Sequence, residues 1–364
     1  MWQKIKDIAE LRIGLSDLVD NRLRSYRVPS DTNIFYTIGI VTLVAYMIQA
    51  VTGYFLLMYY VPHSAHAFNS IQDIMTVIPY GWFIRMVHIV AGNLMVALLF
   101  IHLISIFFLG SYKKPRELTW IAGGCLLLVV LGFCLSGYLL PWSQRSYWAT
   151  TIVTNIPTAF PVIGNKLANL MRGGETISGL TLTRFFSVHV GFLPPIFMAL
   201  VGIHVFLVWR IGLSVPPLSQ SASEEKPWTE FSRVTYSKSY PFYPNFLVKE
   251  LSMVMLFLAV TFFIIAFVPT LFLPEAATTP ADQLKTPANI KPEWYFLAPY
   301  QMLKMIPNKF LGISLQVIAI IVLLFWPFLD TKEERNVLKR PLMLVTFIIL
   351  IAAWAALTLW GRYS

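Results

Sequence analysis

The sequence predicts an all-α polytopic membrane protein with about seven spans. Of its 364 residues, 57% are apolar and only 13% are charged, and the mean hydropathy is +0.65. Apolar runs longer than about eighteen residues recur along the chain, and a helix of that length crosses the hydrocarbon core of a bilayer. Composition and run length together therefore indicate a bundle of membrane helices joined by loops.

Residues 1–32 precede the first apolar run. They open with the charged, amphipathic stretch Met1-Trp-Gln-Lys-Ile-Lys6 and carry no cleavable signal pattern. We expect an interfacial helix that lies on the membrane surface.

Seven apolar runs follow, in a group of four and a group of three. The predicted spans lie at about 33–60, 83–109, 118–141, 184–212, 246–272, 312–329 and 341–361. The segment 214–245 between the groups is polar and rich in proline and serine, so we expect a solvated cytoplasmic connection there. The predicted domains on either side of it are 33–213 and 246–364.

The basic residues orient the chain. With the N-terminus in the cytoplasm, about two thirds of the 28 Lys and Arg residues fall on the cytoplasmic side, in agreement with the positive-inside rule. Two long loops, 143–183 and 274–311, then face outward, and loops of this length are usually functional. This topology, together with anionic lipid, explains the net charge of +10, and no nucleic-acid partner is expected.

Four of the six histidines form two pairs in two predicted helices. His88 and His102 are fourteen residues apart, and His189 and His204 are fifteen apart. At this spacing the two imidazoles of a helix lie roughly 21–22 Å apart on nearly one face. Both helices run inward, so His88 faces His189 near the outer side and His102 faces His204 near the inner side.

Ionisable residues inside a membrane are usually functional, and histidine is a common axial ligand of heme iron. We therefore predict two stacked hemes, each with one histidine from either helix, inside a four-helix heme-binding bundle with three further transmembrane helices. The alternative is that each histidine only packs or forms hydrogen bonds.

Glycines on the neighbouring helices repeat the same spacing. Gly39 and Gly53 lie in the first span, and Gly123 and Gly137 in the third, each pair fourteen residues apart. Glycine lets backbones and flat groups approach closely, so these positions would clear room for two macrocycles. Ordinary helix packing is the alternative.

Cations and cysteines add to this interpretation. Arg85 precedes His88 by three residues at the outer edge, where a heme propionate would need a positive partner. Arg116 lies with Lys113 and Lys114 at the inner edge and could serve in the same way, although cytoplasmic loops contain such basic residues in any case. The two cysteines share one span and no C-x-x-C-H motif is present, so any heme would be b-type, without thioether bonds.

Several motifs resemble those of the cytochrome b family of the bc1 and b6f complexes. The most specific is Pro292-Glu-Trp-Tyr295, and Gly137-Tyr-Leu-Leu-Pro-Trp142 and Leu182-Thr-Arg-Phe185 also match. The resemblance covers nearly the whole chain. Its details are closest to a bacterial cytochrome b6-like half fused to a subunit IV-like half.

The resemblance implies a quinol:cytochrome c oxidoreductase that works by a Q cycle. Quinol would bind at the outer face near Pro292, Trp294 and Trp142, Glu293 would accept a quinol proton, and Tyr295 and Tyr300 would position the substrate. One electron would go to a Rieske iron–sulfur protein and the other through the two b hemes to quinone at the inner face. A c-type cytochrome, either c1/f-like or multiheme, and a homodimeric complex in a bacterial inner membrane are implied as well.

One position departs from the cytochrome b6 pattern. The family has a cysteine in an Asn-Ile-Phe-Tyr-Cys run that anchors a third heme, but this chain reads Asn33-Ile-Phe-Tyr-Thr37. A third heme near the inner site is therefore either absent or bound non-covalently.

Two other functions are compatible with the histidines. A diheme membrane anchor for another dehydrogenase would need the four histidines but not the Pro292–Tyr295 motif or the long outward loops. A transporter with histidine proton relays would contain no heme. His63 and His66 in the first outward loop are expected to be solvated residues, and the sequence does not identify the quinone.

Overall fold

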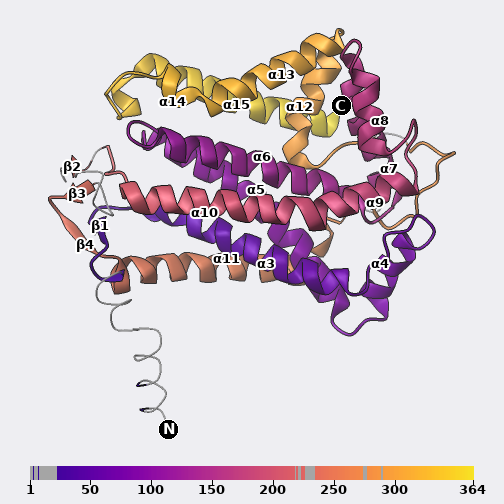
Figure 1. The fold of residues 1–364 in the computed structure, drawn as a ribbon, viewed down its shortest axis with the longest axis horizontal. Helices are drawn as coiled ribbons and strands as arrows, with labels where there is room; N and C mark the ends of the chain where they lie inside the picture. Colours follow the sequence, from indigo (N-terminus) through magenta and orange to yellow (C-terminus); the bar gives the residue numbers. More distant parts are fainter. Residues whose placement is uncertain are drawn as a thin grey trace.

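The computed structural model describes residues 3, 7, 23–217, 219, 223–225, 234–273, 277–287 and 290–364. Long helices run side by side along the molecule (Figure 1). Among the described residues, six helical segments are long and apolar enough to cross a membrane: Ile34–Leu57, Gly81–Phe108, Glu117–Leu139, Gly179–Ile211, Phe242–Phe267 and Pro341–Tyr363. The predicted all-α polytopic membrane fold is confirmed.

The sixth of the seven expected spans is shorter than the others. Residues 312–329 were predicted as one span, but the structure has α13 (Lys309–Leu324, 16 residues) followed by the short α14 (Trp326–Leu329). Phe325 leaves helical geometry between them, and Pro327 stands in the first turn of α14, where proline is tolerated. The apolar run therefore bends before it ends.

The expected surface helix at 1–32 lies mostly outside the described residues. Its last part, Arg27–Pro29, is a strand (β1) and not a helix, because it pairs antiparallel with β4 (Ser239–Pro241). A second short ladder joins β2 (Ser223–Glu225) to β3 (Val234–Tyr236). Both ladders lie at the inner end of the molecule as oriented by the basic residues.

Four helices form the central bundle. They are α3 (Ile38–Leu57, after the 3-10 turn η2, Ile34–Thr37), α5 (Gly81–Phe108), α6 (Glu117–Leu139) and a long helix made of α9 (Gly179–Ser187), the π-helical turn η4 (Val188–Phe192) and α10 (Leu193–Ile211). Helix α3 packs along α5, and α6 packs along α10. Tyr46 of α3 stacks on Phe197 of α10, with ring centroids 3.9 Å apart, and closes the middle of the bundle.

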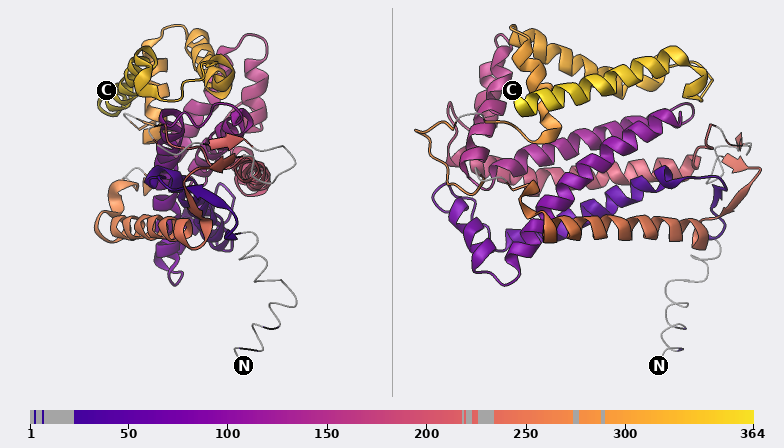
Figure 2. Two further views of the ribbon diagram at one scale, coloured as in Figure 1. Left: turned by 90° about the vertical axis from the view of Figure 1, so that its left-hand side faces the viewer. Right: turned by 180° about the vertical axis from the view of Figure 1, so that it is seen from behind.

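The remaining helices lie on two opposite sides of this bundle (Figures 1 and 2). Helix α11 (Leu247–Phe267, after η5, Phe242–Phe246) packs on α3 and α5. On the other side, α13 and α14 pack on α6, and α15 (Pro341–Tyr363) stacks Phe347 on Phe107 of α5. The part of the chain after residue 246 thus encloses the bundle from both sides.

Short elements cover the outer end. They are α4 (Ala67–Thr76), α7 (Gln144–Asn155), η3 (Ile156–Ala159), α8 (Gly164–Arg172), η6 (Pro269–Leu271), η8 (Trp294–Phe296) and α12 (Leu297–Met305). The two long outward loops are joined here. The backbone N–H of Gln144 donates to the Thr279 carbonyl at 2.9 Å, and that of Ala281 donates to the Trp142 carbonyl at 3.1 Å.

The inner end is joined by side chains of the segment between α14 and α15, where the 3-10 turn η9 (Val337–Lys339) also lies. Asp330 pairs with Lys113 (2.9 Å) and Arg340 (2.5 Å) and accepts a hydrogen bond from the Tyr112 hydroxyl. Burial raises the pKa of Asp330, but the hydrogen bonds from Arg340, Tyr112 and Lys113 outweigh it and lower that pKa to about 2.

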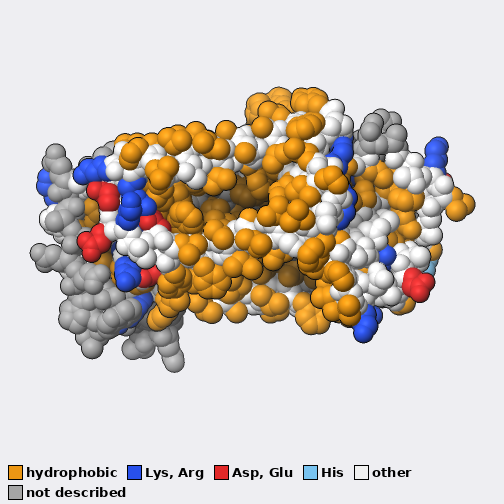
Figure 3. Space-filling view, turned by 90° about the horizontal axis from the view of Figure 1, so that it is seen from above, with side chains coloured by type: hydrophobic (Ala, Val, Ile, Leu, Met, Phe, Trp, Pro, Cys, Tyr) orange, Lys and Arg blue, Asp and Glu red, His pale blue; other side chains and the backbone are white. Residues whose placement is uncertain are grey.

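Charged side chains gather at both ends of the molecule and leave an apolar band between them (Figure 3).

Candidate functional site

The four histidines lie inside the central bundle. His88 and His102 are on α5, His189 is in the π-helical turn η4, and His204 is on α10. His88 lies within electrostatic range of His189, and His102 within that of His204. The structure therefore brings together the same two pairs that the span count predicts, while their role as ligands stays a prediction.

Each histidine faces one of the four glycines. Gly53 and Gly39 of α3 face His88 and His102 of α5. A Cβ atom added at Gly53 would come within 3.3 Å of the His88 Cε1 atom, and one at Gly39 within 3.4 Å of the His102 Cε1 atom. The missing side chains on α3 therefore leave the space in which these imidazoles lie.

The same arrangement repeats between α6 and α10. A Cβ at Gly123 would lie 3.2 Å from the His204 Cε1 atom, and one at Gly137 only 2.6 Å from the His189 Cε1 atom. Real Cβ contacts are essentially never as short as the last distance. Four glycines thus form two recesses, one per histidine pair, that admit the imidazoles, and a pair of facing imidazoles is the donor set of a bis-histidine heme.

The outer histidines are held by hydroxyl groups. The Thr52 hydroxyl donates to the Ile48 carbonyl (2.6 Å), so its oxygen accepts from His88 Nδ1 at 2.9 Å. The Ser136 hydroxyl donates to the Gly132 carbonyl (2.7 Å) and accepts from His189 Nδ1 at 3.1 Å. Because Nδ1 carries the proton in both rings, the Nε2 lone pairs are free for a metal.

The inner histidines are held differently. His204 Nδ1 is 3.0 Å from the carbonyl oxygen of Thr119, which can only accept, so this ring is also protonated on Nδ1. His102 Nδ1 is buried without a hydrogen-bond partner among the described residues. Three of the four rings are therefore fixed in the tautomer that a ligand of iron needs.

The two arginines predicted to face propionates have different surroundings. Arg85 is buried on α5 within electrostatic range of His88, and it forms no ion pair with another described residue. The Arg116 guanidinium donates to the carbonyls of Gly212 (3.2 Å) and Leu213 (3.3 Å) at the end of α10. The role of both arginines beside a cofactor stays a prediction.

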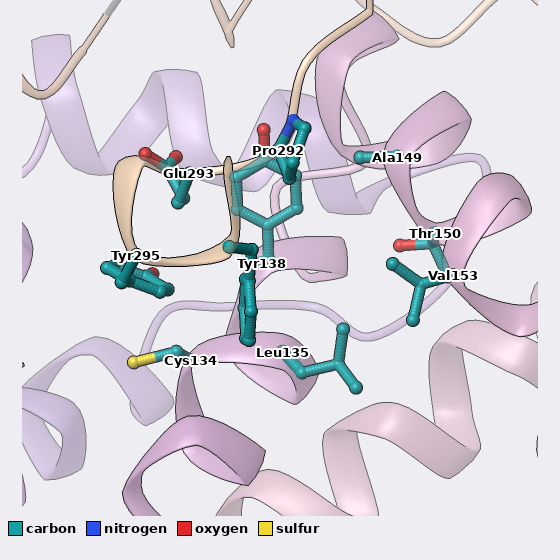
Figure 4. Close-up of a pocket in the computed structure, with 10 residues that line it drawn as sticks. Cys134, Leu135, Tyr138, Ala149, Thr150, Val153, Pro292, Glu293 and Tyr295 are labelled. Carbon is teal, nitrogen blue, oxygen red and sulfur yellow. The ribbon is translucent and has the colours of Figure 1, made fainter. Parts of the chain in front are cut away.

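A pocket lies at the outer end, between α6, α7 and the predicted quinol motif (Figure 4). Ten residues line it: Cys134, Leu135, Tyr138, Ala149, Thr150, Val153, Pro292, Glu293, Tyr295 and Phe296. Of the residues predicted for the quinol site, Pro292, Glu293 and Tyr295 are in this lining. The pocket is the place where the two outward loops meet.

Three other predicted residues lie outside the lining. The Trp294 indole donates to Asn93 Oδ1 on α5 at 3.0 Å, which anchors the motif to the bundle. Tyr300 lies on α12, where the ammonium of Lys304 is 5.7 Å from its ring centroid. Trp142 is buried edge-to-face against Tyr147. These three can support the pocket but do not form its wall.

The carboxylate of Glu293 is mostly buried. Its side chain is 17% exposed, and Arg145 Nη2 is 3.5 Å from Glu293 Oε1. Burial raises the pKa of Glu293, and the charges of Arg145 and Arg362 partly offset that rise. A carboxylate with a raised pKa is a stronger proton acceptor than an ordinary surface carboxylate.

Tyr295 is almost fully buried, and Cys134 and Glu293 line the same pocket. Burial, reinforced by Cys134 and the nearby Glu293, raises the pKa of Tyr295 well above its usual value. Its phenol is therefore neutral at physiological pH and can serve as a hydrogen-bonding group.

Sequence reasoning missed several residues of these sites. Thr52 and Ser136 directly precede Gly53 and Gly137, so a hydroxyl residue before a recess glycine could have identified them. Arg145 is one of the few cations in the loops predicted to face outward, which is a weaker signal. Tyr138 lies in the Gly137–Trp142 motif but was not singled out, and nothing in the sequence distinguishes Cys134 from an ordinary residue of a span.

Two further expectations concern other ligands. Thr37 is buried and its hydroxyl donates to the Ile34 carbonyl (2.7 Å). A threonine has no thiol, so this position cannot attach a third heme by a thioether bond. The His63 and His66 rings lie 5.3 Å apart. No group of three or more His, Cys, Asp or Glu residues able to hold a metal ion occurs within the described part of the chain.

Comparison with known proteins gives two family matches. Residues 23–212 match the model for cytochrome b/b6/petB, and residues 280–364 match the model for the C-terminal part of cytochrome b/b6/petD. The chain is 35% identical over 327 residues to cytochrome b of Rickettsia typhi, which covers 90% of this chain and 79% of the relative. It is 37% identical over 313 residues to cytochrome b of Dictyostelium discoideum, covering 85% and 76%.

A solved structure agrees over nearly the full length. A chain of a hyperthermophilic respiratory Complex III superposes with a TM-score of 0.89 at 36% identity, and the match covers 98% of this chain and 91% of the other.

Proposed function

This chain belongs to the cytochrome b family, and from that premise we propose that it is the cytochrome b subunit of a quinol:cytochrome c oxidoreductase of the Complex III type. The observation that carries the proposal is the repeated unit of two facing histidines and two opposing glycines, found once near each end of the bundle. A diheme anchor shares that unit, but the pocket around Glu293 between the two outward loops favours a quinol-oxidising subunit.

We propose that the chain binds two b hemes, one at each pair of histidines. His88 and His189 would ligate the outer iron, and His102 and His204 the inner one. When bound, these groups accept and pass single electrons across the membrane. Hydrogen bonds to Thr52, Ser136 and the Thr119 carbonyl orient the imidazoles of His88, His189 and His204, respectively. Arg85 provides a buried positive charge near the outer pair.

Quinol is the proposed substrate of the outer pocket. Glu293 would accept a proton from a quinol hydroxyl and release it at the outer surface, because its buried carboxyl has a raised pKa and borders the pocket. The neutral phenol of Tyr295 would orient the substrate by a hydrogen bond. The anchor from Trp294 to Asn93 keeps this segment against α5, the helix that carries His88.

The proposed partners follow from the reaction. One electron from each quinol would go to a Rieske iron–sulfur protein and on to a c-type cytochrome, and the other through the chain to quinone at the inner face. We propose a homodimeric complex in a bacterial inner membrane, surrounded by lipid, with a cytoplasmic N-terminus. The positive-inside distribution of basic residues supports that orientation.

The first test is a reduced-minus-oxidised spectrum with a pyridine hemochrome assay on the purified complex, resolved by subunit. Two b hemes per copy of this chain are expected. A preparation without heme would refute the proposal and favour a transporter, and an additional extractable heme would identify a third, non-covalent group.

The second test separates a quinol oxidase subunit from a diheme anchor. Glu293→Gln should lower quinol oxidation by at least about tenfold, because it removes the general base, while both heme signals stay intact. Unchanged turnover in this variant would exclude Glu293 as the proton acceptor.

A further inference from the structure

Arg145 occupies a position that helix energetics disfavours. It is the second residue of α7, where the helix dipole is positive and a basic side chain is unfavourable. The start of α7 is rigid nevertheless. Ser143 and Ser146 form a capping box, and the Gln144 side chain donates to the Lys285 carbonyl (3.0 Å) and accepts from the Asp282 N–H (3.0 Å). The arginine is therefore fixed in place by the junction of the two outward loops.

Its side chain is directed toward the quinol motif. Arg145 Nη2 lies 3.5 Å from Glu293 Oε1, and both side chains are mostly buried. The guanidinium carbon also lies 5.7 Å from the centroid of the Tyr138 ring, which lines the pocket. A single, long contact of this kind attracts the carboxylate without saturating its oxygens, so one oxygen stays available to a substrate.

The other groups around Glu293 do not supply the same charge. Tyr138 and Cys134 of α6 and Tyr295 of the same segment are ordinarily neutral groups. Arg362, near the end of α15, acts on Glu293 electrostatically, but its contact is not among the ion pairs of the described residues. Arg145 is thus the cation that directly contacts this carboxylate in the described part of the chain.

We infer that Arg145 is a positioning residue for quinol oxidation, which keeps the buried Glu293 side chain ionised and aimed at the pocket so that it can accept a proton from the substrate. This inference rests on the function proposed above. Burial alone favours a protonated carboxyl, and a protonated carboxyl cannot act as a base. The nearby cation counteracts that effect, and its removal should make the site work only at higher pH.

The test compares the purified complex carrying Arg145→Met, Arg145→Lys or Lys166→Met with the wild type. Quinol oxidation is measured against pH with decylubiquinol and with 2,3-dimethylnaphthoquinol, and a soluble c-type cytochrome is the electron acceptor. The acidic limb for Arg145→Met should move upward by about one pH unit. Arg145→Lys keeps a positive charge beside Glu293, so its acidic limb should lie close to that of the wild type. Lys166→Met is the matched control: it removes an exposed cation from α8, at the same end of the molecule as α7 (Figure 1), and its pH profile should match that of the wild type.

A double variant tests whether the effect acts through Glu293. In a Glu293→Gln background, Arg145→Met should cause no further shift of the pH profile. The heme spectra of all variants should stay unchanged, because Arg145 contacts none of the four histidines. An infrared titration of the carboxyl stretch that disappears in Glu293→Gln gives the same pKa shift independently of turnover.

The outcomes are distinct. An unshifted profile in Arg145→Met, or a shift that persists without Glu293, would overturn the inference while quinol oxidation by the wild type still supports the proposed function. A wild-type complex that holds both hemes but oxidises neither quinol at any pH would overturn the proposed function, and the inference with it.

Discussion

The outer and inner ends of the four-helix bundle hold their histidines by different means. At the outer end, the hydroxyls of Thr52 and Ser136 fix His88 and His189. At the inner end, a backbone carbonyl fixes His204, and His102 Nδ1 has no described partner. The outer recess is also tighter, since Gly137 leaves less room than any other recess glycine.

This difference shows how one repeated unit can be adjusted locally. A hydroxyl that already donates to its own helix can only accept from an imidazole, so it fixes both the ring orientation and the tautomer. An imidazole with a free Nδ1 can rotate or bind a water molecule. We expect the outer site to be the more rigid of the two, and the following variants test that contrast.

Removing a ligand should have the largest effect. His102→Ala should abolish the inner heme and leave the outer one at least partly bound, and His88→Ala should do the reverse, because each iron would lose one of two axial ligands. The pyridine hemochrome signal per chain should fall to about half, as expected for two b-type sites. Loss of both hemes in both variants would mean that the sites are not independent.

The second-largest effect should come from adding a methyl group at a recess glycine, and it should differ between the two ends. Gly137→Ala would place a Cβ 2.6 Å from the His189 Cε1 atom, whereas Gly39→Ala would place one 3.4 Å from the His102 Cε1 atom. We expect Gly137→Ala to lose most of the outer heme and Gly39→Ala to retain the inner one. Redox titration of the two b signals measures this, and equal losses would contradict the tighter outer recess.

Removing the hydroxyls should have a smaller effect. Ser136→Ala and Thr52→Val delete the acceptors of the His189 and His88 Nδ1 protons, and loss of such supporting partners typically weakens metal binding by about tenfold or more. The outer heme should dissociate more readily and change its potential, while the inner heme should not change. Thr42→Val, on the same helix but bonded only to the Gly39 carbonyl, is the matched control.

The smallest effect should come from the ion cluster at the inner end. Asp330→Asn leaves Lys113 and Arg340 without a buried anion and should lower the unfolding temperature by about 5 °C. Since the pKa of Asp330 is lowered to about 2, the stabilisation is present above the unfolded value of about 4 and is lost as pH falls from there toward 2. Wild type and variant should therefore converge in acid, and a constant difference across that range would argue against the cluster.

Much of the architecture was predictable from hydropathy alone. The length of the apolar runs identified the six long helices. Counting the spans showed that the two histidine helices run in the same direction, and this direction together with the histidine spacing gave the pairing of His88 with His189. The bend at Phe325 and the strand at Arg27–Pro29 could not be predicted in this way. A bend inside an apolar run leaves its hydropathy unchanged, and a three-residue strand depends on a partner more than two hundred residues away.

Part of the pocket lining was predictable from a sequence motif. Glu293 and Tyr295 were identified by their motif and lie together in the pocket. Trp294 and Tyr300 belong to the same stretch but point elsewhere, because adjacent positions in a turn and helix face different directions. Arg145 could not be assigned to Glu293 from sequence, since their contact depends on how the two outward loops meet.

The two parts of the chain are fastened to each other at both membrane surfaces. At the end that carries the pocket, Gln144 is hydrogen-bonded to the 279–285 segment. At the opposite end, Arg335 donates to the carbonyls of Gly110 and Val215 beside the Asp330 cluster. These contacts fix how the two parts pack against each other, and none of them depends on the segment that links the parts. Two separate polypeptides, divided between residues 217 and 234, should therefore recognise each other and reassemble into one working subunit.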